Sequence, residues 1–191
     1  MSGAGAIFCG CCGCYDIECE HCSTGAPSSI LLTFEGITIT ECVQGEGGEL
    51  AWAADGDLDA VNGTFCILPD EVDLCRWDGV PITEETLAIY FVSEFDTCEQ
   101  VIATGTPGPV GVNICRADGK WIVYITAGDV PEVIIFYAEI STVDCRTGGT
   151  ASNELVNGNG EQITLSVCTG DDLFYEMGTG GSVTLTPCCP A

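Results

Sequence analysis

Cysteine is the residue type in this chain with the greatest capacity for chemistry. Fifteen cysteines occur in 191 residues, and eight of them are bunched at the two ends. Thiols at this density either pair as disulfides or bind a soft metal ion as thiolates. The fifteen are Cys9, Cys11, Cys12, Cys14, Cys19, Cys22, Cys42, Cys66, Cys75, Cys98, Cys115, Cys145, Cys168, Cys188 and Cys189.

The six N-terminal cysteines have spacings that could suit a metal site. Cys9–Cys14 reads CGCCGC and Cys19–Cys22 reads CEHC, so neighbouring sulfurs can converge on zinc or Cu(I), and His21 can add an imidazole. However, metal cages usually draw on two separated knuckles, and no Lys is present here to offset thiolate charge. We therefore expect a disulfide-knotted segment, with a thiolate metal-binding protein as an alternative.

The remaining cysteines favour disulfides more clearly. Each single cysteine lies in or beside a predicted strand, where a bridge would contribute roughly 2–4 kcal/mol. Adjacent cysteines bond each other only with strain, so Cys188 and Cys189 are expected to reach different partners. One of these two is predicted to pair with a cysteine among residues 9–22, closing almost the whole chain into a loop. The odd total leaves one cysteine as a buried thiol or an intersubunit bridge.

Oxygen ligands and a sugar acceptor are weaker features. Asp55, Asp57 and Asp59 alternate as in the beginning of a calcium loop, but Ala60 and Thr64 stand near the positions where an EF-hand requires Gly and Glu. The prediction is therefore no cofactor, with calcium as the one possible ion. Asn62-Gly63-Thr64 is a glycosylation sequon, which matters only if the source glycosylates.

Aromatic and catalytic groups give little support to a ligand site or an enzyme. Trp52, Trp77 and Trp121 could form a sugar-stacking platform, although core or disulfide packing is the favoured interpretation. A single histidine excludes most Ser-His or Cys-His machinery, and 29 acidic residues make chance carboxylate pairs inevitable. The chain is predicted not to be an enzyme.

The charge balance of the chain limits the classes of partner that it can bind. Four basic residues against 29 acidic ones give a formal charge of −25, which repels nucleic acid and anionic lipid. No apolar run is long enough to cross a membrane, so no membrane insertion is expected. Residues 1–8 lack the features of a secretory signal peptide, in conflict with the cysteine count. An extracellular or virion-surface location resolves the conflict if a leader has been processed away or if oxidation follows host lysis.

The elements that must position these residues are short strands. Residues 1–27 form a Gly/Cys-rich segment without hydrophobic period, and residues 28–191 read as one β-sandwich domain. The fold class is all-β: an antiparallel β-sandwich of about ten strands with a disulfide-stapled N-terminal segment. The predicted strands are Ser28–Phe34, Ile37–Val43, Gly63–Leu68, Thr86–Val92, Cys98–Thr104, Val110–Cys115, Lys120–Ile125, Val133–Glu139, Gln162–Cys168 and Ser182–Pro187.

The clearest secondary-structure patterns are one hairpin signal and two strand signals. Asp118-Gly119 between two apolar runs is the strongest hairpin signal in the chain. Val183 and Leu185 alternate with threonines, as expected for a half-buried strand. Val133–Tyr137 is apolar on both faces, which predicts a central strand covered on each side.

The segment from Cys19 to Trp77 resembles a group of uncharacterised proteins. It contains a Ser29–Ile37 strand ending in Gly-Ile, then Gly63-Thr64-Phe65-Cys66, then Cys75-Arg76-Trp77. This sequence pattern resembles that of cysteine-punctuated all-β proteins of bacterial and phage genomes, a group with no established activity. The resemblance implies an all-β fold and implies nothing about a ligand.

Together these features favour a structural or assembly protein, such as a virion decoration or tail component or an extracellular filament subunit. Its partners would be copies of itself or other structural subunits. A secreted carbohydrate- or calcium-dependent binding module is the alternative, and a thiolate metal-binding protein is the second alternative.

Overall fold

The computed structural model confirms an all-β fold. It describes residues 14–15, 22, 25–38, 51–55, 61–68, 76–92, 101–104, 106–129, 132–155, 162–164, 173–176 and 180–188. Within these ranges every regular element except a single turn of 3-10 type at Val61 is extended, and none is a helix able to cross a membrane. The strands are β1 (Cys14–Tyr15), β2 (Ala26–Pro27), β3 (Ile30–Glu35), β4 (Ala51–Asp55), β5 (Gly63–Ile67), β6 (Arg76–Val92), β7 (Val101–Thr104), β8 (Gly108–Ala117), β9 (Lys120–Ala127), β10 (Val133–Ser141), β11 (Gly149–Ser152), β12 (Gln162–Thr164), β13 (Leu173–Glu176) and β14 (Ser182–Pro187).

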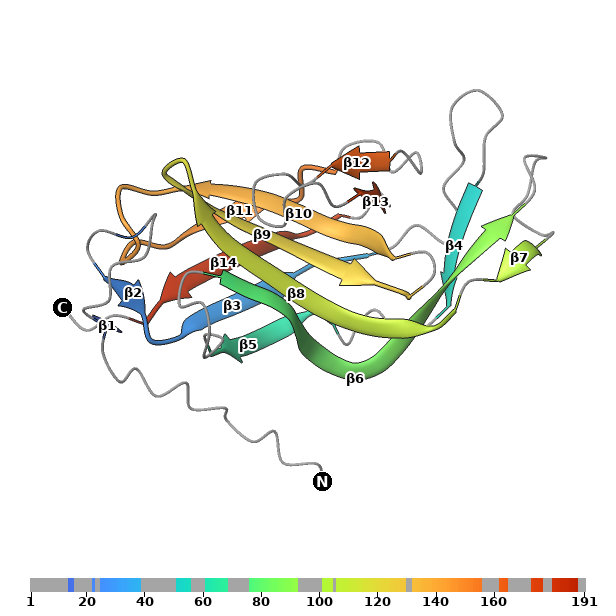
Figure 1. Ribbon diagram of the computed structural model, residues 1–191, viewed down its shortest axis with the longest axis horizontal. Coiled ribbons are helices and arrows are strands. Elements are labelled where there is room, and N and C mark those ends of the chain that lie inside the picture. Colours follow the sequence, from blue (N-terminus) through green and yellow to red (C-terminus); the bar gives the residue numbers. More distant parts are fainter. Residues whose placement is uncertain are drawn as a thin grey trace.

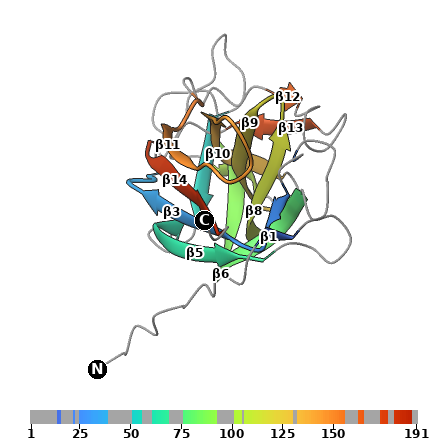
Figure 2. The same cartoon turned by 90° about the vertical axis from the view of Figure 1, so that its left-hand side faces the viewer.

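Two sheets pack face to face as a sandwich (Figure 1). The larger sheet has eight strands in the order β12-β13-β10-β9-β8-β6-β4, with β7 also paired to β6. The smaller sheet has four strands in the order β11-β14-β3-β5. Figure 2 shows β11, β14, β3 and β5 on one side of the molecule and β8 on the other. β1 and β2 form a separate two-stranded pair.

Alternating side chains build the core between the sheets. In β3, Ile30, Leu32 and Phe34 are buried while the residues between them face outward, and β14 repeats the pattern with Val183 and Leu185. The larger sheet contributes alternate residues of β8, β9 and β10 to the same cluster. Phe34 meets Phe136 of the larger sheet edge to face, with ring centres 5.4 Å apart, so the two sheets interlock through aromatic contact.

β8, β9 and β10 are buried on both faces. A second cluster on the outer face of the larger sheet includes Ile122, Tyr124 and Ile134, which are at most 3% exposed. This confirms the prediction of a central strand at Val133–Tyr137. The β8–β9 hairpin also forms as predicted, because Asp118 and Gly119 both adopt positive φ angles, 48° and 76°.

β6 is the longest strand, and it curves across the molecule from β8 to β4 and β7 (Figure 1). Its pairing with β8 shifts register between Trp77 and Val80 and again between Pro81 and Thr86. At the first irregularity, Gly79 has a φ of 57° and its N–H donates to the side chain of Asn113, 2.7 Å away. Irregularities of this kind increase local twist and let one strand serve two neighbours.

The strand predictions fail in a few places. Ile37 and Thr38 are not part of a strand, and the rest of Ile37–Val43 lies outside the described residues. β1, β2, β4, β11, β13 and the first half of β6 were not predicted. One pair, β10 with β13, is parallel rather than antiparallel. The boundary after residue 27 stays a prediction, although Cys22 is 1% exposed and belongs to the sandwich core.

Candidate functional site

A row of four threonines crosses the outer face of the smaller sheet. The strand register places Thr150 opposite Thr184, Thr184 opposite Thr33, and Thr33 opposite Thr64. Each of the four strands therefore contributes one residue, and neighbouring strands lie about 4.8 Å apart. Thr33 is partly exposed and the other three are exposed. We call Thr33, Thr64, Thr150 and Thr184 the threonine row.

The hydroxyls of the threonine row are bonded in two pairs. Oγ1 atoms lie 2.8 Å apart between Thr150 and Thr184, and 3.1 Å apart between Thr33 and Thr64. Antiparallel pairs alternate between wide, backbone-bonded pairs and narrow pairs in which side chains come closer. Since Cys188 N–H donates to Ser29 O in the β14–β3 register, Thr184 and Thr33 form a wide pair. The two contacts at the ends of the row are then the narrow ones, where the hydroxyls meet.

The described strands around the threonine row carry almost no charge on this face. Ser152 and Ser182 lie on one side of it and Thr186 and Leu31 on the other. Among the outward side chains of these four strands, Glu35 is the one that carries a charge. Cys66 also lies on this face, opposite Leu31, and is disulfide-bonded. In a chain with a formal charge of −25, the outward side chains of these four strands form a hydroxyl-bearing surface on which like-charged molecules can approach with little repulsion.

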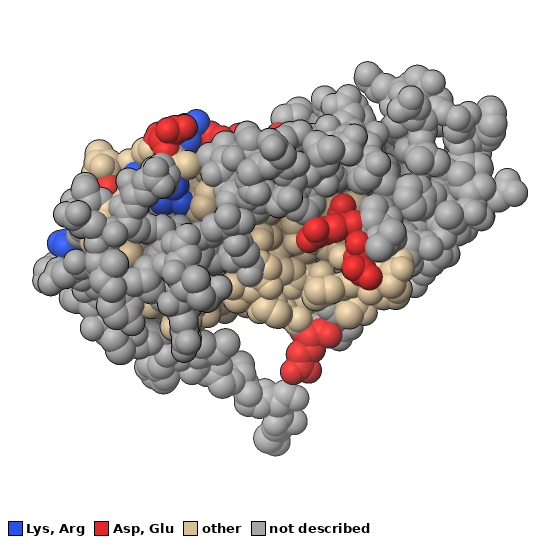
Figure 3. All heavy atoms as spheres, in the orientation of Figure 1, with Lys and Arg blue, Asp and Glu red and all other residues tan. Residues whose placement is uncertain are grey.

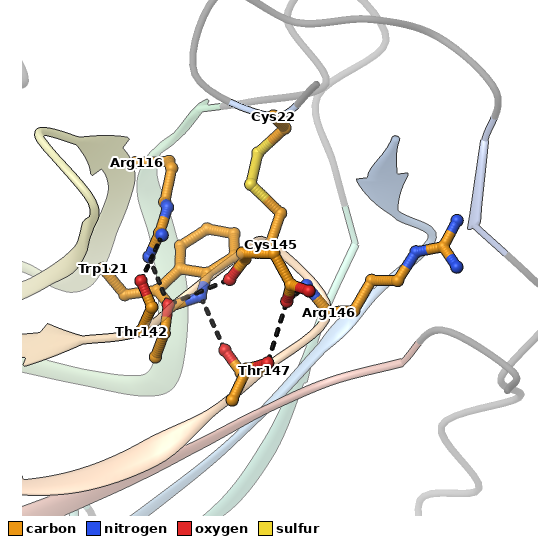
Figure 4. Close-up of a disulfide and its surroundings, with 8 residues drawn as sticks. Cys22, Arg116, Trp121, Thr142, Cys145, Arg146 and Thr147 are labelled. Carbon is orange, nitrogen blue, oxygen red and sulfur yellow. Dashed lines mark hydrogen bonds between the residues drawn. A yellow bond between two sulfur atoms is a disulfide. The ribbon is translucent and has the colours of Figure 1, made fainter. Parts of the chain in front are cut away.

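A disulfide fixes the end of the sandwich beyond the β8–β9 hairpin. Cys22 and Cys145 are bonded with their Cα atoms 5.6 Å apart, across 123 residues of sequence. Both are buried in the core cluster, at 1% and 0% exposure. The bridge therefore ties the N-terminal segment to the loop that follows β10 (Figure 4).

A buried arginine packs beside this bridge. Arg116 is 4% exposed, its guanidinium carbon lies 5.4 Å from the ring centre of Trp121, and its two terminal nitrogens donate to Oγ1 and O of Thr142. Trp121 is fully buried and donates its indole N–H to Thr147 O at 3.2 Å (Figure 4). Burial lowers the pKa of Arg116, and the negative charge of Asp144 opposes this shift. The arrangement is a structural anchor for the loop at 142–147.

Asp144 shapes that loop from within. One carboxylate oxygen, Oδ1, accepts from Thr147 Oγ1 at 2.8 Å and from Arg146 N–H at 2.9 Å. These hydrogen bonds hold the pKa of Asp144 below its usual value, and the bond from the Thr147 side chain makes the largest contribution. The loop therefore presents the bridge cysteine, Cys145, in a defined conformation.

A polar group lies on the outer side of β9 and β10. Lys120 Nζ donates to Glu139 Oε2, and Tyr137 OH donates to Glu139 Oε1 at 3.0 Å. The bond from Lys120 is the main reason why the pKa of Glu139 is lowered, and burial is the main reason why the pKa of Tyr137 is raised. On the face seen in Figure 3, the described Lys and Arg side chains lie at the left end, beside acidic ones, and further acidic side chains project from the right half.

The structure places several predicted cysteines in disulfides. Besides Cys22 and Cys145, it has Cys66 and Cys115 in disulfide bonds. Cys188 is a free thiol, 5% exposed, so the predicted bridge to the N-terminal cysteines does not form at this residue. The backbone of Cys188 is held beside β3, because its N–H is bonded to Ser29 O and its carbonyl accepts from Ser28 Oγ. The same prediction for Cys189, and the remaining cysteine predictions, fall on residues whose side chains are not described.

The other predicted site residues separate in the structure. Trp121 is fully buried, as the core interpretation predicted, so its ring cannot stack on a sugar at the surface. The side chains of Trp52 and Trp77 are not described. Asn62 accepts from Ile37 N–H at 2.8 Å and donates to Ile37 O at 3.0 Å, so its amide has a structural role without a glycan. Asp55 ends β4 without a described side chain, and Asp57 and Asp59 lie outside the described residues.

No group of three or more His, Cys, Asp or Glu among the described residues is placed to hold a metal ion. Comparison of the chain with protein-family models, with known proteins and with solved structures finds no match. The threonine row is the feature that sequence reasoning missed. Its signal is present as threonines at alternate strand positions, but the register that aligns them comes from the folded sheet.

Proposed function

We propose that this chain is a non-enzymatic structural protein that works as one copy among many in an extracellular or virion-surface assembly, such as a virion decoration or tail component or a filament subunit. The observation that carries the proposal is the contrast between the formal charge of −25 and the nearly uncharged outer face of the smaller sheet. Packing this face against a neighbour costs little electrostatic repulsion, because Glu35 is the one member of the 29 acidic residues that lies in these four strands.

Cross-linking supports the same proposal. The bridge between Cys22 and Cys145, and the bonded states of Cys66 and Cys115, restrict the unfolded chain and suit a protein that must persist in an oxidising environment. The alternatives have less support. Trp121 is buried in the core and cannot take part in a carbohydrate-binding platform. Cys22 is bonded in a disulfide and cannot serve as a thiolate ligand of a metal site.

The test is the size of the particle as repulsion is removed. Light scattering and electron microscopy of the oxidised chain across a sodium chloride series should show growth in mass, because salt screens the carboxylates. A calcium series at matched ionic strength separates bridging of carboxylates from screening. A chain that stays monomeric under all of these conditions, and that no virion or filament subunit recruits, would overturn the proposal in favour of a soluble binding module.

A further inference from the structure

Val143 is the most exposed large apolar side chain among the described residues. It is 91% exposed, and the next, Leu68, is 66% exposed. Val143 lies in the loop that joins β10 of the larger sheet to β11 of the smaller one. A single exposed apolar residue is common at protein surfaces, so its meaning depends on how the chain holds it and on what surrounds it.

The chain holds this loop by bonds on both sides of Val143. Thr142, directly before it, donates its N–H to Gly119 O at 3.1 Å, which ties the loop to the tip of the β8–β9 hairpin. Thr142 Oγ1 also donates to Asp144 O at 2.9 Å, so the two neighbours of Val143 are bonded to each other. Cys145 then anchors the loop to the core through its disulfide (Figure 4). A surface held in this way loses little conformational freedom when it binds a partner.

All four basic residues of the chain lie at this end of the sandwich. Lys120 begins β9 at the hairpin, Arg116 ends close to it in β8, and Arg146 belongs to the loop itself. Arg76 is placed here by its register, because it pairs with Cys115, the neighbour of Arg116. Every other charged side chain in the sequence is therefore an Asp or a Glu.

Acidic residues accompany the basic ones at this end. The four that interact electrostatically with Lys120, Arg116 or Arg146 are Asp118, Glu139, Asp144 and Glu154. The described residues of this end thus carry four charges of each sign, in a chain whose formal charge is −25. We call the hairpin tip at 118–120 and the loop at 142–147 the Val143 end.

We infer that the Val143 end of one copy packs against the Val143 end of a second copy across a two-fold axis, with the two Val143 side chains at the centre. A two-fold contact places a surface against itself, so that surface must be self-complementary. An acid-only surface would oppose carboxylates to carboxylates, whereas a surface with both signs can meet itself without net repulsion. An apolar centre with a polar rim is also the usual arrangement of a protein contact.

This contact uses different residues from the threonine row and goes beyond the proposed function. A copy that meets one neighbour through the smaller sheet and another through the Val143 end has two neighbours, so the two contacts together extend an assembly beyond a pair. The Val143 end consists of two short loops, and contacts that bury less than about 1,000 Å² are weak. Pairing therefore needs the repulsion between two chains of formal charge −25 to be screened.

The variant Val143→Asp tests the contact in the background Thr184→Asp, which blocks the smaller sheet with a charge. Thr184→Asp alone should form dimers at high salt in sedimentation velocity. Thr184→Asp/Val143→Asp should be monomeric, with an association constant lower by more than about tenfold, because it opposes two carboxylates at the centre of the contact. The matched control is Thr106→Asp in the same background. Thr106 is exposed and lies at the opposite end of the sandwich, where its carbonyl accepts from Asp129 N–H.

The results separate this inference from the proposed function. The control should dimerise like its parent, and thermal unfolding of Val143→Asp should match that of the wild type, because the side chain is in water. Dimers that persist in Thr184→Asp/Val143→Asp, or that the control loses equally, would overturn the inference. So would a wild type that forms large particles while Thr184→Asp is monomeric at every concentration. A wild type that forms dimers and nothing larger, and loses them with Val143→Asp, would support the inference and contradict the larger assembly.

Discussion

The Cys22–Cys145 bridge joins two segments that are far apart in sequence, and it does so inside the core. Its neighbours are the buried Trp121 and the loop that Arg116 and Asp144 hold in place. A bridge in this position restricts the unfolded chain and also holds the N-terminal segment against the sandwich. Its removal should therefore have a measurable cost even though other disulfides remain.

We expect the double variant Cys22→Ala/Cys145→Ala to lose about 2–4 kcal/mol of unfolding free energy in denaturant titrations followed by tryptophan fluorescence. Cys188→Ala is the matched control, because it removes a buried cysteine that forms no bridge. The control should lose about 1 kcal/mol, the usual cost of a small buried change. Equal losses for the two variants would show that the bridge contributes nothing beyond packing.

Glu139 gives a pH-dependent prediction. Its folded-state pKa is lowered, mainly by the hydrogen bond from Lys120, so its contribution to stability is present above the unfolded carboxyl pKa of about 4.3 and is lost as the pH falls through the lowered folded value. Glu139→Gln should therefore cost less than about 1 kcal/mol near neutral pH and almost nothing below about pH 3. Glu84→Gln, at an exposed position of β6, is the control. A cost for Glu139→Gln that does not change with pH would contradict the assignment.

At the scale of elements, the clearest local signals gave the most accurate predictions. Ser182–Pro187 forms a strand over the predicted residues, because its apolar and hydroxyl side chains alternate without interruption. The hairpin at Asp118-Gly119 formed because both residues tolerate the left-handed backbone that its turn requires. In these segments local preference and tertiary packing favour the same structure.

Predictions failed where tertiary contacts decide the structure. The run beginning at Ile37 leaves the strand conformation where the side chain of Asn62 occupies its backbone N–H and C=O. Gly79 and Pro81 look like strand breakers, yet β6 continues through them because Asn113 satisfies the backbone at the irregularity. The threonine row needs the register of four strands from four separate parts of the chain, which local patterns do not supply.

The hairpin provides a test at this scale. Gly119→Ala should destabilise the fold by about 1–2 kcal/mol, because alanine disfavours the left-handed φ of 76°, while the space around the new methyl group is open. Asp118→Asn keeps a side chain that tolerates this conformation, so it should leave the melting temperature nearly unchanged. Thermal unfolding of both variants measures the difference. A Gly119→Ala variant as stable as Asp118→Asn would show that the turn does not require glycine.

For the whole molecule, the proposed function predicts that charge sets the balance between separate and assembled copies. The formal charge of −25 opposes association at low salt, where the Debye length is about 30 Å at 0.01 M, and loses most of its range at about 1 M, where it is about 3 Å. We expect the association constant to rise steadily between these limits in sedimentation experiments. Association that weakens with salt would instead indicate a contact made by attraction between opposite charges.

Light scattering of Thr184→Asp across a salt series is the measurement that tests the central claim most directly. Thr184 is exposed within the threonine row, so an aspartate there places a charge on the face that carries the proposed function. The wild type and the control Thr184→Val should grow in mass as salt is added, whereas Thr184→Asp should remain smaller under the same conditions. Growth of Thr184→Asp equal to that of the wild type would contradict assembly through the outer face of the smaller sheet.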